Sequence, residues 1–127
     1  MKIFIIDDDY ISVFLTQHIL IKEGVSNDIT SFSSAEEALA ILLSETVEVP
    51  QIIFLDLNMP AMDGWEFLEE LMTYKEQFLR RCRIYLLTSS LDISDMNKAN
   101  EIELVSGFIH KPINYEDIQV IQQENNI

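Results

Sequence analysis

The sequence has little of what several classes of protein require. Its single cysteine, Cys82, excludes an internal disulfide and a zinc site built from cysteines. It has no apolar segment long enough to cross a bilayer and no signal-peptide pattern at its start. We therefore predict a cytoplasmic protein that does not enter a membrane, with Cys82 as a small buried residue.

Positive charge is also scarce. The chain has 22 acidic and 8 basic residues, which give a formal net charge of -14. A chain this acidic is not expected to bind the phosphate backbone of nucleic acid or an anionic membrane surface. Four of the basic residues lie within residues 75–83. That segment is either a solvated connection or a docking patch for an acidic partner.

Glycine and proline are few, with three of each in 127 residues, while 48% of the residues are hydrophobic. This composition suits one packed domain over residues 1–127, because the chain is too short for two comfortable cores. Residues 73–82 form the longest charged connection, which we expect to be a loop or an extension of the preceding helix. No internal repeat or low-complexity tract interrupts the chain.

Short apolar runs with strand character recur along the chain and are separated by segments of helical periodicity. The predicted strands cover residues 2–6, 27–32, 52–55, 83–87 and 105–110. The predicted helices start near Ile11, after the capping pattern of residues 34–37, after Gly64, near residue 91 and after Asn114. Five strands alternating with helices indicate an α/β fold, with a parallel sheet covered by helices on both faces.

Two of the predicted helices have distinctive apolar patterns. In the first, a stripe beside His18 consists of Ile11, Phe14, Leu15 and Ile19, and we expect His18 to be a packed residue rather than a metal ligand. The segment 91–101 has only three apolar residues on one face, namely Ile93, Met96 and Ala99. We therefore expect that helix to be weakly anchored and mobile.

Polar residues stand at the ends of four of the predicted strands. A single aspartate at a strand end is commonly a solvated or turn-capping residue. Here the pattern recurs, and a parallel sheet brings the carboxyl ends of its strands to one edge. We therefore expect one crevice to contain Asp7, Asp8, Asp56, Thr88 and Lys111.

These side chains permit phosphoryl transfer. Neighbouring carboxylates repel one another, and Mg²⁺ relieves that repulsion because it prefers oxygen ligands, here including the backbone carbonyl of Asn58. With the cation bound, Asp56 can act as a nucleophile toward phosphorus. Lys111 supplies a fixed cation for the phosphoryl oxygens, and Thr88 supplies a hydroxyl donor.

The sequence resembles the receiver domain of two-component response regulators. The resemblance rests on residues 5–9 (IIDDD), 55–64 (LDLNMPAMDG), 86–90 (LLTSS) and 108–112 (FIHKP). It implies a flavodoxin-like, three-layer (βα)5 fold with strand order 2-1-3-4-5 and a cis peptide bond before Pro112. It also implies magnesium held by Asp8, Asp56 and the Asn58 carbonyl, with Asp7 acting through water.

The resemblance further implies how such a protein works. Asp56 would accept a phosphoryl group from a sensor histidine kinase or a histidine phosphotransfer protein, and Thr88 and Phe108 would then rearrange as a switch. The expected protein is a stand-alone receiver that binds an unknown downstream target or relays phosphate. It would not be an enzyme beyond catalysing its own phosphotransfer and dephosphorylation.

Two alternatives compete with this interpretation. A phosphatase of the haloacid dehalogenase-like kind also uses an aspartate with magnesium, but it needs an acid two residues after the nucleophile, where this chain has Asn58. A pseudo-receiver would bind partners without accepting phosphate. The simultaneous presence of Asp7, Asp8, Asp56 and Lys111 argues against it.

Overall fold

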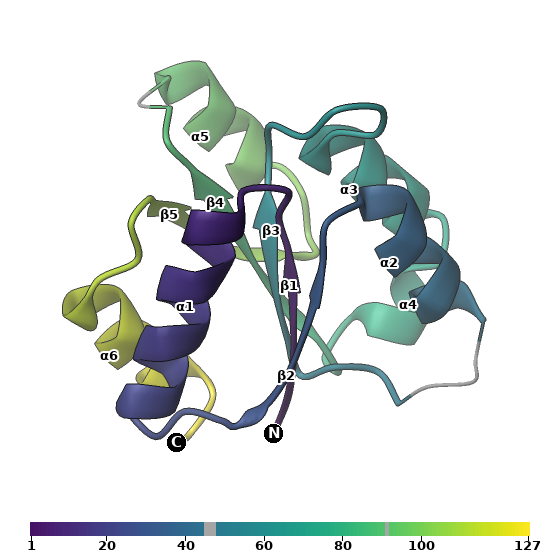
Figure 1. Ribbon diagram of the computed structural model, residues 1–127. Coiled ribbons are helices and arrows are strands. Elements are labelled where there is room, and N and C mark those ends of the chain that lie inside the picture. The colour runs from purple at the N-terminus through teal and green to yellow at the C-terminus, as the bar shows by residue number, and fades with distance from the viewer. Residues whose placement is uncertain (45–47, 91) are drawn as a thin grey trace.

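A five-stranded parallel sheet forms the centre of the protein in a computed structural model, which describes residues 1–44, 48–90 and 92–127. The strands lie in the order β2-β1-β3-β4-β5 (Figure 1). Their bounds are β1 Lys2–Ile6, β2 Asp28–Phe32, β3 Ile52–Asp56, β4 Arg83–Thr88 and β5 Val105–His110. This architecture confirms the predicted fold class, the strand order and all five predicted strands.

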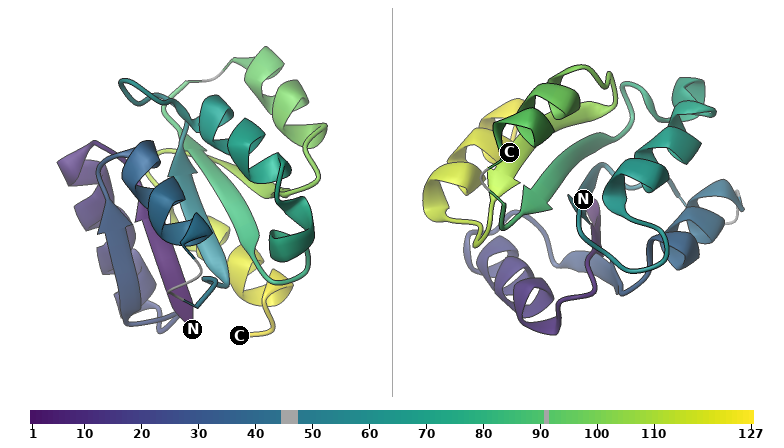
Figure 2. Two further views of the ribbon diagram at one scale, coloured as in Figure 1. Left: turned by 90° about the vertical axis from the view of Figure 1, so that its right-hand side faces the viewer. Right: turned by 90° about the horizontal axis from the view of Figure 1, so that it is seen from above.

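Helices cover both faces of the sheet. Their bounds are α1 Tyr10–Lys22, α2 Ala35–Leu43, α3 Gly64–Met72, α4 Lys75–Phe78, α5 Ile93–Asn100 and α6 Tyr115–Glu124. Helices α1 and α6 pack on one face, and α2, α3, α4 and α5 lie on the other (Figures 1 and 2). Within the described residues, none of these helices combines the length and the apolar character needed to span a membrane.

The strands are apolar on both sides because both sides are buried. Successive side chains of a strand point to opposite faces, so β1 sends Phe4 and Ile6 to one apolar layer and Ile3 and Ile5 to the other. Strand β3 divides its side chains in the same way. Two hydrophobic layers therefore hold the sheet rigidly in the middle, which explains why these strands lack the alternation of a half-exposed sheet.

Polar residues at the start of the helices determine where each loop ends. Asp63 and Asn114 each form a complete capping box, with Glu66 and Asp117 respectively. The predicted cap at Ser34 is also present, since its hydroxyl accepts a hydrogen bond from the Glu37 amide at 3.3 Å. Because the caps follow the strands closely, they keep the loops at the carboxyl edge of the sheet short.

Helix α1 forms where predicted, but of its predicted apolar stripe only Ile19 packs, partly buried, against the core. Ile11, Phe14 and Leu15 have exposed fractions of 69%, 62% and 44%, while the buried residues of the helix are Thr16 and Leu20. His18 is also exposed and stacks on Phe14 with ring centroids 6.1 Å apart. The helix has apolar residues on both sides, so periodicity alone could not indicate which side faces the sheet.

Helix α3 does not extend into the connection that follows it, because it ends at Met72 and the short helix α4 follows. In α5 only Ala99 is buried, whereas Ile93 and Met96 are 70% and 46% exposed. This burial agrees with the weak anchoring predicted for the segment. Residue 91, where the predicted helix begins, lies outside the described residues.

Close packing requires a glycine at position 64. A Cβ at this position would lie 2.7 Å from the carbonyl oxygen of Asp56 and 2.9 Å from the Cα of Leu57. Both neighbours are backbone atoms, which cannot move aside cheaply. The first residue of α3 therefore lies directly against the end of β3, and this contact fixes the position of Asp56.

Candidate functional site

Three aspartates converge at the carboxyl edge of the sheet, at the upper end of the strands in Figure 1. Asp7 and Asp8 follow the last residue of β1, and Asp56 is the last residue of β3. Each offers a carboxylate oxygen, and these oxygens lie within 4.8 Å of one another. The parallel sheet therefore brings together acids that are almost fifty residues apart in the sequence, as the strand-end pattern predicted.

Lys111 completes this cluster from the end of β5. Its Nζ lies 2.9 Å from Oδ2 of Asp7 and 3.4 Å from Oδ1 of Asp56. The backbone N–H of Lys111 donates a hydrogen bond to the Thr88 carbonyl at 2.8 Å, and its peptide bond to Pro112 is cis, as the resemblance implied. The ammonium is thus held between two carboxylates from two different strands.

The three carboxylates differ in exposure. Asp7 and Asp56 are buried, with exposed fractions of 2% and 4%, while Asp8 is exposed at the mouth. Oδ1 of Asp7 accepts a hydrogen bond from the Asp9 amide at 2.9 Å. Among the described residues, its Oδ2 has the Lys111 ammonium as its partner and no further hydrogen bond.

The buried charges perturb one another. Burial raises the pKa of Asp56 to about 6, and the nearby charge of Asp7 adds to this rise. Lys111 and the Asn58 amide, which donates to Oδ1 of Asp56 at 3.3 Å, oppose the increase only in part. For Lys111, burial lowers the pKa, but the hydrogen bond and charge of Asp7, together with Asp56, outweigh burial and leave the pKa raised.

The other predicted site residues surround this cluster. Thr88 is fully buried at the end of β4, and its hydroxyl oxygen accepts a hydrogen bond from the Ser90 amide at 3.0 Å. Phe108 lies on β5 and packs, partly buried, against the apolar layer that α5 covers. Asn58 is exposed just beyond Asp56, with its backbone carbonyl on the same loop.

The residues of this edge fit a magnesium ion. Three carboxylates face one ammonium, so the cluster keeps an excess of negative charge. All of the available donors are oxygens, which is the ligand type that Mg²⁺ selects. A divalent cation would compensate the charge that Lys111 leaves unbalanced.

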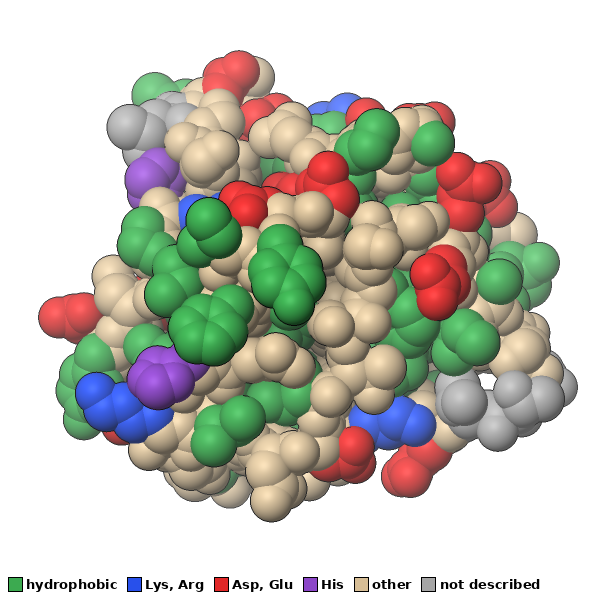
Figure 3. Space-filling view, viewed as in Figure 1, with side chains coloured by type: hydrophobic (Ala, Val, Ile, Leu, Met, Phe, Trp, Pro, Cys, Tyr) green, Lys and Arg blue, Asp and Glu red, His purple; other side chains and the backbone are tan. Residues whose placement is uncertain are grey.

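Sequence reasoning missed an apolar surface next to the site. A cavity of about 310 Å³ lies between helix α1 and the loop after β5, lined by residues that include Ile11, Leu15, Ser89, Lys111 and Pro112. Figure 3 shows hydrophobic side chains gathered on the α1 side, below the acidic cluster. The sequence shows the apolar stripe of Ile11, Phe14 and Leu15 but not that it faces solvent, because α1 also has apolar residues on its other side.

Comparisons with known proteins agree with this geometry. Residues 3–122 match the family model of the response regulator receiver domain. The crystal structure of a response regulator receiver protein from Dyadobacter fermentans DSM 18053 superposes with a TM-score of 0.85 at 28% identity. The match covers 98% of this chain and 96% of that one.

Two curated relatives show similar identity over different shares of their length. Sporulation initiation phosphotransferase F of Bacillus subtilis (strain 168) is 28% identical over 120 residues, which are 93% of this chain and 87% of that protein. Hybrid signal transduction histidine kinase L of Dictyostelium discoideum is 28% identical over 121 residues, which are 94% of this chain but 7% of the kinase. The matched unit is therefore most of one relative and a small part of the other.

The raised pKa of Asp56 predicts a pH-dependent gain in stability when this carboxylate is removed. Between its ordinary pKa of 3.8 and about 6, the folded state binds more protons than the unfolded state, so ionised Asp56 lowers the free energy of unfolding as pH rises. We expect Asp56→Asn to raise the free energy of unfolding by about 1–3 kcal/mol at neutral pH in a chelating buffer. Urea unfolding measures this difference.

The gain should shrink as the pH falls toward 3.8, where Asp56 is protonated in the folded state and half protonated in the unfolded state. Asp28→Asn, at an exposed position of β2, is the matched control and should change the stability by less than about 0.5 kcal/mol. A loss of stability in Asp56→Asn at neutral pH would contradict the sign of this effect.

Proposed function

Because this chain belongs to the family of response regulator receiver domains, which are phosphorylation-dependent switches of two-component signalling, we propose that Asp56 is its phosphoacceptor. The observation that carries this proposal is the position of one buried carboxylate at a strand end, between two other acids and an ammonium. A phosphohistidine on a sensor kinase or a histidine phosphotransfer protein is the proposed donor.

We assign the magnesium ligands as Asp8, Asp56 and the backbone carbonyl of Asn58. Asp8 is the exposed acid at the mouth and can turn toward a cation, whereas Asp7 is buried and paired with Lys111, which suits contact through water. When bound, the ion screens the negative charge that otherwise keeps a carboxylate and a phosphoryl group apart. The chain's own residues supply the nucleophile and the remaining positive charge.

In the proposed step, a carboxylate oxygen of Asp56 forms a bond to phosphorus while the phosphorus–nitrogen bond of the donor breaks. The imidazole nitrogen keeps the electron pair of that bond. The Lys111 ammonium, 3.4 Å from Oδ1 of Asp56, is placed to compensate charge on the phosphoryl oxygens. Attack by water on phosphorus later breaks the bond to Asp56, releases inorganic phosphate and regenerates the free Asp56 carboxylate.

The switch would run through Thr88 and Phe108. The Thr88 hydroxyl, now bonded by the Ser90 amide, turns to donate to the phosphoryl group, and Phe108 fills the space that it leaves. Helix α5 begins at Ile93 with only one buried residue, Ala99, so a small free-energy difference can displace it. Phe108 has no hydroxyl, so a partner would recognise its new position by packing alone.

The exposed stripe of α1 is the proposed docking face for the donor protein. The donor must bring phosphorus to Asp56, so it necessarily covers the rim of the site. On one side that rim consists of Ile11 and Leu15, which line a cavity together with Lys111. Phe14 belongs to the same exposed stripe of α1. Such an apolar helical surface suits a partner that presents apolar helices of its own.

Labelling with a small phosphoryl donor tests the phosphoacceptor. With phosphoramidate and Mg²⁺, we expect mass spectrometry to locate one labile phosphoryl group on Asp56, because the site itself carries the catalytic residues. Labelling should disappear in Asp56→Asn and in the presence of a chelator, while the control Asp28→Asn should label like the wild type. In the labelled protein, amide hydrogen exchange should change mainly within residues 88–111.

The same assay separates the alternatives. Sustained turnover of unrelated phosphate esters would indicate a phosphatase, and absence of labelling would indicate a module that only binds partners. An unchanged exchange profile in residues 88–111 would contradict the proposed switch and leave the phosphoacceptor intact.

Substitutions on α1 test the docking face separately from the chemistry. We expect Phe14→Ala to slow transfer at least fivefold from a phosphorylated histidine phosphotransfer protein that labels the wild type, because an aromatic contact buried at the centre of an interface contributes about 1 kcal/mol or more. Labelling by phosphoramidate should stay within twofold of the wild type. Transfer is measured by following the phosphoryl group on gels.

Ile21→Ala, at an exposed position on the last turn of α1, is the matched control and should leave both reactions unchanged. If Phe14→Ala slows both reactions equally, or neither, the donor does not dock on this face.

A further inference from the structure

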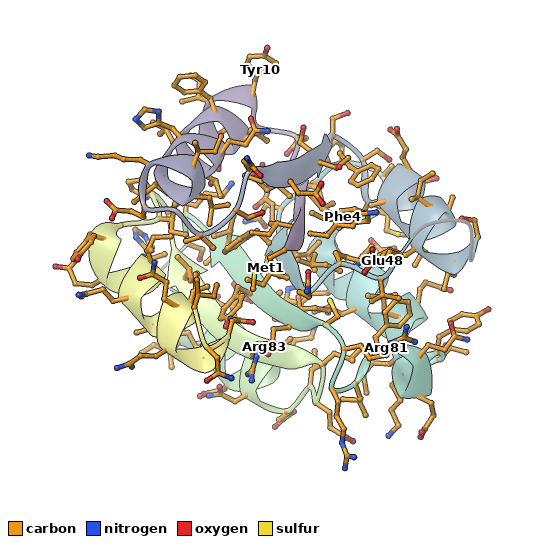
Figure 4. All side chains as sticks on the ribbon, turned by 90° about the horizontal axis from the view of Figure 1, so that it is seen from below. Met1, Phe4, Tyr10, Glu48, Arg81 and Arg83 are labelled. Carbon is orange, nitrogen blue, oxygen red and sulfur yellow. The ribbon has the colours of Figure 1, made fainter. Side chains whose placement is uncertain are left out.

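A second concave surface lies at the opposite end of the sheet, where the strands begin. It is a cavity of about 380 Å³ whose lining includes Gln51, Arg80, Arg81, Arg83, Ser106 and Asn125. Figure 4 looks onto this end of the molecule, with Arg81 and Arg83 labelled. The chain has a net charge of -14, yet three of its eight basic residues line this cavity.

The three arginines are exposed, and within residues 1–44, 48–90 and 92–127 none of them forms an ion pair. The acids that line the same cavity are already engaged. Glu103 pairs with Lys75 at 3.3 Å, and Glu124 accepts a hydrogen bond from the Tyr85 hydroxyl at 2.9 Å. The cavity therefore presents guanidinium groups that form no ion pair within the described residues, together with amide side chains. The Arg81 guanidinium donates one hydrogen bond, to the Gln77 carbonyl at 3.5 Å.

The local backbone explains why the arginines gather here. Phe78 and Cys82 are buried, and Arg80 between them adopts a left-handed backbone with φ 70° that turns the chain from α4 into β4. Arg81 lies within this turn, where its amide donates to the Phe78 carbonyl at 3.1 Å, and Arg83 is the exposed first residue of β4. The turn thus places three arginines along the lining of one cavity.

We propose that this cavity binds a small phosphorylated molecule. Guanidinium groups bind phosphate oxygens in pairs of parallel hydrogen bonds, and three of them suit a dianionic phosphate better than a single carboxylate. The volume lies in the range of small-molecule sites, and the polar lining suits a hydrophilic ligand. Without a bound cation the acidic carboxyl edge of the sheet repels such an anion, whereas the arginine end attracts it.

This site is separate from the phosphoacceptor. Strand β4 has Arg83 at its first residue and Thr88 at its last, so the two ends lie roughly 16 Å apart at the rise of a strand. A ligand held by Arg83 therefore does not reach Asp56. The inference does not depend on the proposed phosphorylation, and the variant Asp56→Asn should bind the ligand as the wild type does.

Titration of isotope-labelled protein with pyrophosphate, in a chelating buffer without Mg²⁺, tests this proposal. We expect saturable amide shifts confined to residues 79–83, 104–106 and 124–126, and a weakening of binding as salt is raised. Arg81→Gln and Arg83→Gln should each weaken binding at least threefold, and the double variant at least tenfold. Lys22→Gln, which removes the same charge from an exposed position of α1, is the control and should change affinity by less than twofold.

Three results would overturn the proposal. The first is the absence of saturable shifts at these residues up to about 10 mM pyrophosphate, with the folded state of each variant checked by thermal unfolding. The second is equal weakening by Lys22→Gln, which would indicate diffuse electrostatic attraction. The third is tighter binding of a polyglutamate peptide of matched charge at the same residues, which would make the cavity a docking surface for an acidic protein.

Discussion

The paired contacts of the Lys111 ammonium with Asp7 and Asp56 are the interaction on which this site depends. They join the end of β5 to the ends of β1 and β3. Burial raises the pKa of Asp56 in this region. Removing one partner of such a buried pair leaves a charge without compensation. One ammonium cannot balance three carboxylates, and the remaining negative charge makes this edge suited to a divalent cation.

The parallel sheet also separates opposite charges. Its carboxyl edge gathers acids from the strand ends, and its other edge carries the arginines that precede and begin β4. Two apolar layers keep the sheet rigid between these edges, so packing fixes the strand ends from which each charged cluster projects. A well-packed core therefore separates the two charged edges of the sheet. Helix α5 and the outer face of α1 are weakly covered.

Much of the fold could be predicted, because strands buried on both faces produce apolar runs that are easily recognised. The strand ends also predicted which acids would meet, since parallel strands bring their carboxyl ends to one edge. The outward stripe of α1 could not be predicted, because Phe14 and Leu20 are both apolar and only the packed structure shows that Leu20 faces the sheet. The contact of Gly64 with the Asp56 carbonyl depends on tertiary distance, which local sequence does not encode.

The central claim is that residues far apart in the chain form one cation site around Asp56. Manganese tests it directly, because Mn²⁺ accepts the same oxygen ligands as Mg²⁺ and broadens nearby nuclear magnetic resonance signals. At low Mn²⁺ concentration, the account predicts that amide signals of residues 7–9 and 56–58 broaden first and recover when Mg²⁺ is added in excess. First broadening elsewhere, for example around Glu36 and Glu37, or no selective broadening, would contradict it.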